Sequence, residues 1–210
     1  MTNFLSKPLG FSETFLRAEY IENAVNYRLV SQTVVINAHN KQIVIEGKSL
    51  KPWNSSIYSS LVIPKAPKII CITLDTDLFL SGSYPHADVL TRKWSRVDKL
   101  FPVPHLKDTQ LWRSEKDRIG PVEFNFWFAA AGTNCGIHNE HNFKEFHTQV
   151  FGIGRMQKFH KNDRNSIYQE VFMSPGYTHE PFYNEDCTYP WHQYWADTDC
   201  IWLAIEFYGG

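Results

Sequence analysis

Short apolar runs, separated by polar turns, fill the C-terminal half of the chain. β-branched and aromatic residues, which favour strands, dominate these runs. None of the runs shows a convincing helical spacing of its apolar residues. Strands of this length, joined by short turns, predict an all-β sandwich or barrel. The runs are Val122–Ala129, Gly136–His141, Glu145–Phe159, Ile167–Met173 and Cys200–Tyr208.

The N-terminal half is also rich in predicted strands. Phe11–Val30 has the apolar spacing of a short amphipathic helix, with an irregular segment as the alternative. β-branched runs follow it as far as residue 74. Leu90–Pro121 holds three prolines and many charges, which is typical of a long connection. We therefore expect residues 1–110 to form a strand-rich extension and residues 111–210 a barrel, packed together as one compact unit.

One sequence similarity within the chain suggests a duplication. Leu78–His86 resembles Val171–His179, because Phe, Ser, Tyr and His coincide in the two segments. The extension is then a degenerate copy of the barrel. No His/Glu cluster accompanies the first segment, so only the second copy would keep a metal.

Composition excludes several classes of function. The formal net charge is -1, with acids and bases interspersed, so the basic surface of a nucleic-acid-binding protein is not expected. No uncharged apolar stretch approaches the ~20 residues that span a bilayer, and the N-terminus has no signal-peptide pattern. We expect a cytoplasmic protein without a membrane partner, in which the four widely spaced cysteines are reduced thiols.

Residues 132–152 concentrate side chains that bind metals. Three histidines and two glutamates fall between His138 and His147. Neutral imidazole and carboxylate are common ligands of catalytic transition metals. A carboxylate buried among imidazoles is costly unless a cation compensates its charge. The stretch therefore predicts a metal site. Its histidines and glutamates are His138, Glu140, His141, Glu145 and His147.

Strand geometry sorts these side chains. Residues two apart in a strand face the same side, so His138 and Glu140 point together and His141 points away. After a short turn Glu145 begins the next strand, and an antiparallel hairpin brings its face opposite the first. A β-bulge would instead give the triplet His138, His141 and Glu145. Both arrangements stay open.

Further residues are candidates for proton transfer and substrate binding. Glu140 becomes a candidate base if it does not bind the metal. His147 shares the face of Glu145 and is a second candidate, and His192, between a Trp and a Gln, is a candidate acid–base or additional ligand. The residues that we expect to contact the substrate are Gln149, Tyr177, Trp191, Tyr194 and Trp202.

The spacing of these residues resembles the first motif of the cupin superfamily. That motif runs Gly, five residues, His-x-His, three or four residues, Glu, six residues and Gly. Gly132, His138, Glu145 and Gly152 fit every spacing. The departure is Glu140, which stands where the family usually has its second His.

A second motif of the same family is matched more loosely. It runs Pro-x-Gly, two residues, His, three residues and Asn. Gly176 and His179 keep this spacing, whereas Pro175 sits one place late and Asn184 one place beyond the expected Asn. The resemblance covers about residues 120–208.

The resemblance implies a double-stranded β-helix, or jelly-roll barrel, with a bound transition metal. His138, Glu145 and His179 would hold the ion, with Glu140 or a neighbour as the fourth ligand. Cupins commonly carry iron, manganese, nickel, copper or zinc, and iron is the metal that we expect here. A homodimer is a further expectation.

The predicted function follows from such a site. We expect a metal-dependent enzyme that acts on a small polar organic molecule, in the first place a non-haem dioxygenase or other oxygenase, because two His and one carboxylate leave positions for dioxygen and substrate. A redox-neutral lyase, decarboxylase or isomerase is one alternative. A non-catalytic cupin that binds a small molecule is another.

Overall fold

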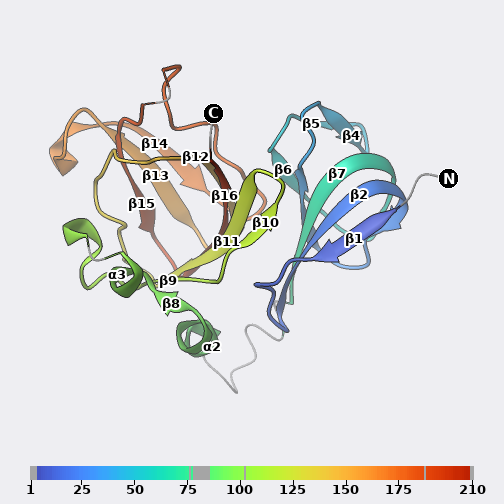
Figure 1. The fold of residues 1–210 in the computed structure, drawn as a ribbon, viewed down its shortest axis with the longest axis horizontal. Coiled ribbons are helices and arrows are strands. Elements are labelled where there is room, and N and C mark those ends of the chain that lie inside the picture. Colours follow the sequence, from blue (N-terminus) through green and yellow to red (C-terminus); the bar gives the residue numbers. More distant parts are fainter. Residues whose placement is uncertain (1–3, 76, 78–85, 102, 187, 209–210) are drawn as a thin grey trace. The chain divides into compact units, whose positions relative to one another are not determined.

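A computed structural model of the chain describes residues 4–75, 77, 86–101, 103–186 and 188–208 (Figure 1). The chain divides into two compact units, Met1–Ser83 with Gly176–Thr178, and Tyr84–Pro175 with His179–Gly210. The boundary lies near residue 84 and not near residue 110, because β8 (Ser95–Arg96) pairs with β9 (Leu111–Arg113) in a sheet of the second unit. The segment expected to be a long connection is therefore part of that unit.

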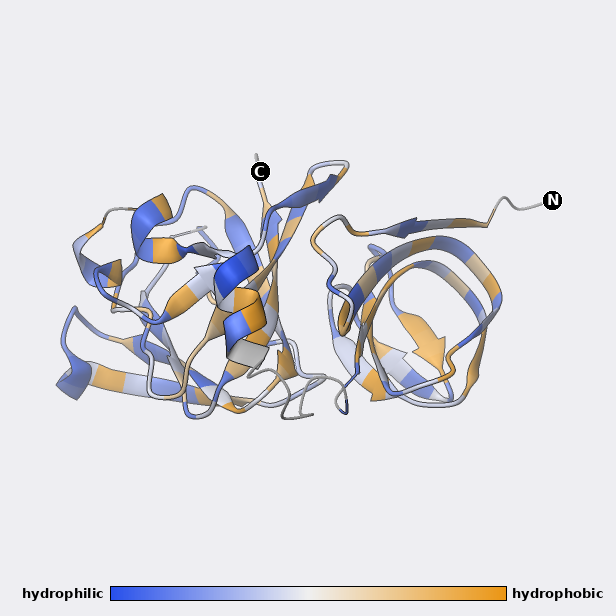
Figure 2. Ribbon diagram, turned by 90° about the horizontal axis from the view of Figure 1, so that it is seen from below, coloured by the Kyte–Doolittle hydropathy of each residue, from blue (hydrophilic) through white to orange (hydrophobic). Residues whose placement is uncertain are grey.

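The first unit is built on an antiparallel sheet of five strands in the order β1-β2-β7-β3-β6, with β4 and β5 paired separately. Hydrophobic and hydrophilic residues alternate along its curved strands (Figure 2). Its core includes Ile21, Val35, Ile45 and Ile63, which are fully buried. The strands are β1 (Leu5–Pro8), β2 (Leu16–Arg28), β3 (Thr33–Asn37), β4 (Ile43–Ile45), β5 (Lys48–Leu50), β6 (Ser55–Tyr58) and β7 (Val62–Leu74).

The helix predicted over Phe11–Val30 is wrong, since β2 occupies most of it. Asn23 and Asn26 have φ values of 54° and 51° and are not paired with residues of β7. The register between β2 and β7 is the same before and after each of them. Both lie opposite prolines of β7, which have no N–H for the ladder. The alternation of buried residues already breaks at Tyr20 and Ile21, which are both buried, and with Ala24 the pattern imitates a helical period.

The repeat predicted between Leu78–His86 and Val171–His179 is not tested, because residues 78–85 lie outside the described residues. A degenerate copy of the barrel in residues 1–110 therefore stays a prediction. Of the four cysteines, Cys71, Cys135 and Cys200 are buried free thiols, and Cys187 lies outside the described residues.

The second unit contains two sheets. The larger has the order β12-β16-β11-β9-β8, with β10 on β11, and the smaller has the order β14-β13-β15. No helix in the described ranges has the length and apolar character needed to cross a membrane. The further strands are β10 (Asp117–Ile119), β11 (Val122–Ala129), β12 (Lys144–Phe151), β13 (Gly154–Phe159), β14 (Ile167–Met173), β15 (Trp191–Ala196) and β16 (Cys200–Phe207). The helices are α2 (His86–Lys93), α3 (Val97–Leu100) and the 3-10 turns Pro104–Leu106 and Arg164–Ser166.

The two sheets of this unit share one core. Ala129 and Trp202 of the larger sheet pack in one cluster with Met156, Met173 and Tyr194 of the smaller. The segment before β12 extends the smaller sheet, through isolated bridges to β15. The expected all-β fold with a jelly-roll barrel is therefore confirmed, and β11 and β14 have the bounds that the sequence predicts.

Gly152, which ends the first motif, occupies a turn that a side chain does not fit. Its φ is +74°, and a Cβ there would lie 1.9 Å from the carbonyl oxygen of Asp199. We expect Gly152→Ala to lower the free energy of unfolding by more than the roughly 1–3 kcal/mol that a strained φ alone costs. Gly120→Ala is the matched control, since Gly120 has a φ of +60° and open space around it. Urea denaturation measures both, and equal losses would contradict the steric argument.

Candidate metal centre

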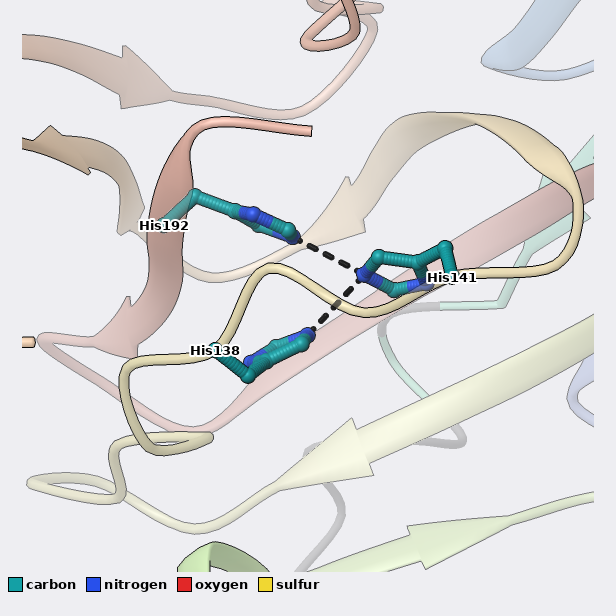
Figure 3. A group of neighbouring side chains, drawn as sticks. All are labelled: His138, His141 and His192. Atoms are coloured by element: carbon teal, nitrogen blue, oxygen red, sulfur yellow. Dashed lines mark hydrogen bonds between the residues drawn. The ribbon is translucent and has the colours of Figure 1, made fainter. Parts of the chain in front are cut away.

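Three histidine side chains converge inside the second unit (Figure 3). Nε2 of His141 lies 3.0 Å from Nε2 of His138 and 3.1 Å from Nε2 of His192. One donor atom from each of the three lies within 4.8 Å of the others. Such a spacing allows all three rings to bind one ion.

Backbone structure fixes two of these rings. The N–H of His138 donates to the carbonyl of His192 at 3.0 Å, and the N–H of His192 donates back at 2.9 Å. This reciprocal bridge holds the segment before β12 against the start of β15. His138 follows Gly136, whose φ of +71° turns the chain just before the bridge.

Hydrogen bonds at Nδ1 leave the Nε2 atoms free to bind a metal. Nδ1 of His138 donates to the carbonyl of Gly136, and Nδ1 of His192 donates to that of Pro190, each at 2.9 Å. In a neutral imidazole, a proton on Nδ1 leaves a lone pair on Nε2. Burial lowers the pKa of His138 and lowers that of His192 to about 3. Both rings are therefore neutral at pH 7, as metal ligands must be.

Glu145 adds a carboxylate to this group from the start of β12. Its Oε2 accepts a hydrogen bond from Nε2 of His147 at 3.1 Å, and its Oε1 lies 3.8 Å from Nε2 of His141. Burial acts to raise the pKa of Glu145, but the neighbouring histidines, His147 first and then His141 and His192, together outweigh burial and hold this pKa below its usual range. The site therefore contains a buried carboxylate anion beside three imidazoles.

The structure does not bring His179, a predicted ligand, into this group. Its Nε2 accepts the backbone N–H of His147 at 2.9 Å, and its Nδ1 donates to the carbonyl of Glu180 at 2.7 Å. The ring is 1% exposed, and both nitrogens are engaged by backbone. Gly176 and His179 keep the spacing of the second motif, but the chain at His179 runs along the edge of β12. His192 occupies the place expected for His179.

His141 and Glu140 exchange the positions that strand parity predicts. Residues 139–143 are not in a strand, so the alternation of faces does not apply to them. His141 turns inward to the other two rings, whereas Glu140 is exposed and lies at the lining of the cavity. The structure thus differs from the prediction of Glu140 as a ligand and resembles the bulge alternative, with His141 beside Glu145.

A cavity of about 420 Å³ opens onto the three histidines. Apolar side chains from both sheets and from the segment before β9 form much of its wall, among them Leu106, Leu111 and Met156. His147 also lines it, and its Nδ1 is buried without a hydrogen-bond partner in the part of the chain that the structure describes. The volume is within the usual range of small-molecule sites, roughly 300–1,000 Å³.

The residues predicted to contact a substrate divide into two groups. Tyr194 and Trp202 line the cavity, as expected. Gln149 does not, because backbone carbonyls and the hydroxyl of Tyr194, at 2.8 Å, hold its amide. Trp191 and Tyr177 also lie outside the lining, since Trp191 alternates with the inward-facing next residue of β15 and Tyr177 groups with the first unit.

Several polar residues of the cavity gave no signal in the sequence. His105 stacks on His138, with ring centroids 4.9 Å apart and an interplanar angle of 6°. Lys116 bonds to the carboxylates of Glu206 and Glu123. Arg113 lies on β9. These residues have no characteristic spacing from residues 132–152, and strand pairing alone brings them to the cavity.

Comparisons with known proteins give structural likeness only. No family model matches the sequence, and no curated protein matches it. Ectoine synthase from P. lautus is 11% identical, with a TM-score of 0.39 over 59% of this chain and 76% of that chain. A cupin superfamily protein from Desulfitobacterium hafniense is 11% identical, with a TM-score of 0.37 over 55% and 90%. An RmlC-like cupin from Desulfovibrio desulfuricans is 15% identical, with a TM-score of 0.35 over 47% and 82%.

Cupins are thus among the solved structures to which this chain is similar. Identities of this size concern the fold and carry no activity over to the chain.

Proposed function

We propose that the second unit is a metal-dependent cupin enzyme that acts on a small polar organic molecule. The observation that carries the proposal is the convergence of three histidine Nε2 atoms, with that of His141 lying 3.0 and 3.1 Å from the other two. The other two rings each have Nδ1 bonded to a backbone carbonyl. His138, His141 and His192 are the proposed ligands, and Glu145 is the fourth. Imidazole with one carboxylate suits iron, nickel, copper or zinc, and manganese less well.

Oxygen chemistry on iron is the reaction that we propose. Four protein ligands leave positions open on a six-coordinate ion, and a bound metal would supply a site where dioxygen and substrate meet. The chain contributes the apolar wall of the cavity, which excludes water from that site. The exposed Glu140 lies at the lining, from where it can contact an entering molecule.

A redox-neutral reaction, such as that of a lyase or isomerase, is the second candidate, and His147 favours it. Its Nε2 is anchored on the carboxylate of Glu145, so its Nδ1 is oriented and available to accept or donate a proton. General acid–base catalysis by an oriented imidazole contributes typically about 10²–10⁴-fold to a rate. Oxygen consumption that accompanies turnover distinguishes the two candidates.

Elemental analysis of protein purified without chelator tests the proposed site. We expect roughly one equivalent of a transition metal per chain, or uptake of that amount on reconstitution, because three neutral imidazoles and a carboxylate form a complete ligand set. X-ray absorption should show imidazole nitrogen in the coordination shell. Uptake of less than about a tenth of an equivalent of every such metal would contradict the proposal.

A further inference from the structure

Three unsatisfied donors lie side by side in the same cavity. Arg113 is paired with Trp127 across β9 and β11, and Trp127 with Trp202 across β11 and β16. This row shares one face of the sheet, and all three side chains line the cavity. Nε of Arg113 and both indole Nε1 atoms are buried without a hydrogen-bond partner among the described residues.

The chemistry of these atoms defines what can satisfy them. Indole N–H and guanidinium N–H groups donate hydrogen bonds and cannot accept them. Each buried donor without a partner costs about 1–3 kcal/mol. The indole rings of Trp127 and Trp202 are stacked, with centroids 6.1 Å apart and an interplanar angle of 8°, and Trp202 is only 2% exposed. A group that accepts several hydrogen bonds fits this row.

The charge of the row favours a monoanion. In the part of the chain that the structure describes, no carboxylate lies within salt-bridge distance of Arg113, whose guanidinium packs over the ring of Phe101 at 5.0 Å. The nearby cation, Lys116, is already bound to Glu206 and Glu123. Glu206 and Glu123 act on the guanidinium of Arg113 only from beyond salt-bridge distance. A guanidinium with planar donors and no bound carboxylate matches a carboxylate ligand, whereas a phosphate dianion would need more positive charge.

We propose that Arg113, Trp127 and Trp202 bind a carboxylate group of the substrate, so that the enzyme acts on a small carboxylic acid. As a statement about the substrate, this proposal rests on the proposed function. The ring of His147 lies 6.0 Å from that of Trp202 and is bonded to Glu145. A molecule of a few carbon atoms, held at the row by its carboxylate, therefore reaches the three histidines.

Nuclear magnetic resonance of the tryptophan indole N–H groups tests this subsite directly. Propionate is titrated into ¹⁵N-labelled full-length protein at constant ionic strength, with propionamide as the uncharged control of equal shape. We expect saturable shifts at Trp127 and Trp202, and binding of propionamide weaker by at least about tenfold, or 1.4 kcal/mol. Trp112 faces the opposite side of β9 and should not shift.

Variants separate the row from general charge effects. Arg113→Gln should weaken propionate binding by about 10-fold or more, because it removes the charged donor. Arg118→Gln is the matched control, since Arg118 is exposed and bonds to the carbonyl of Gly120 outside the cavity. A folded Arg113→Gln protein that binds propionate as well as the wild type would overturn the proposal. Equal binding of propionamide, no saturable shift, or binding of phosphate but not propionate would also overturn it.

Chelator-treated and metal-loaded samples distinguish this proposal from the proposed function. Saturable propionate shifts in both samples support the subsite. Shifts in a protein that takes up no metal support the subsite and contradict the metal-dependent enzyme. Full metal uptake without any shift at the two indoles contradicts the subsite alone.

Discussion

His192→Ala is expected to lose its metal, while His179→Ala keeps it. His192 contributes one of three converging Nε2 atoms, whereas the ring of His179 bonds to backbone on both sides. Removal of a ligand should weaken affinity by more than about 100-fold, since loss of a supporting partner alone costs roughly 10–100-fold. Metal content and competition with a chromophoric chelator measure the difference.

The contrast needs a control for stability and one for surface histidines. His179→Ala leaves the backbone N–H of His147 without its acceptor, so we expect a loss of about 1–3 kcal/mol in the free energy of unfolding. His179→Gln offers an amide oxygen in its place and should recover part of that loss. His160→Ala, at an exposed position, should change neither quantity. Retention of metal by His192→Ala, or its loss by a folded His179→Gln, would exclude the proposed ligand set.

Lys116→Met is expected to destabilise the second unit by roughly 3 kcal/mol, at the lower end of the range for a broken buried ion pair. Glu206 is 2% exposed, and its carboxylate accepts hydrogen bonds from Lys116, from Nδ2 of Asn125 at 2.9 Å and from the hydroxyl of Tyr208 at 2.7 Å. Without the lysine, a buried negative charge loses the only cation that lies within salt-bridge distance of it among the described residues.

Urea denaturation followed by tryptophan fluorescence measures this effect. Six of the seven tryptophans belong to the second unit, so the signal reports mainly on that unit. Lys161→Met is the matched control, because Lys161 and Asp163 form an exposed pair at 3.6 Å that is expected to contribute less than about 1 kcal/mol. Similar losses in the two variants would show that Glu206 does not depend on Lys116.

Two strands of the second half were predictable to their ends because their patterns are local, whereas Gly136–His141 forms only an isolated bridge and Glu145–Phe159 is two strands. The observed bounds of β11 and β14 are those predicted from two runs with clear ends in the sequence. The failure at β2 has a physical origin, since Tyr20 and Ile21 are both buried and Asn23 and Asn26 leave the pairing opposite two prolines, so that burial does not alternate along the strand. A window of one strand contains no information about the prolines of its partner. Local patterns therefore predict a strand only where its own pairing is regular.

The site was predictable to the same extent. Glu145 lies on a regular strand, and both parity and motif spacing placed it near His138. His141 was predicted only through the bulge alternative, because an irregular segment has no strand parity. Whether His179 or His192 is the proposed ligand depends on which segment runs beside residue 138. The reciprocal backbone bridge places the segment of His192 there, and the sequence does not predict this bridge. Arg113 and Trp127 come together only through sheet register, which the sequence does not express.

The reciprocal backbone bridge between His138 and His192 has a consequence for the speed at which an ion enters and leaves. Two of the proposed ligands are joined by main-chain hydrogen bonds of 3.0 and 2.9 Å, so their separation changes little unless the sheet opens. The third, His141, is carried by a segment without regular structure. Loops open at a lower free-energy cost than paired strands. Exchange of the ion should therefore proceed through release of His141, while the rings of His138 and His192 keep their positions and can bind the next ion.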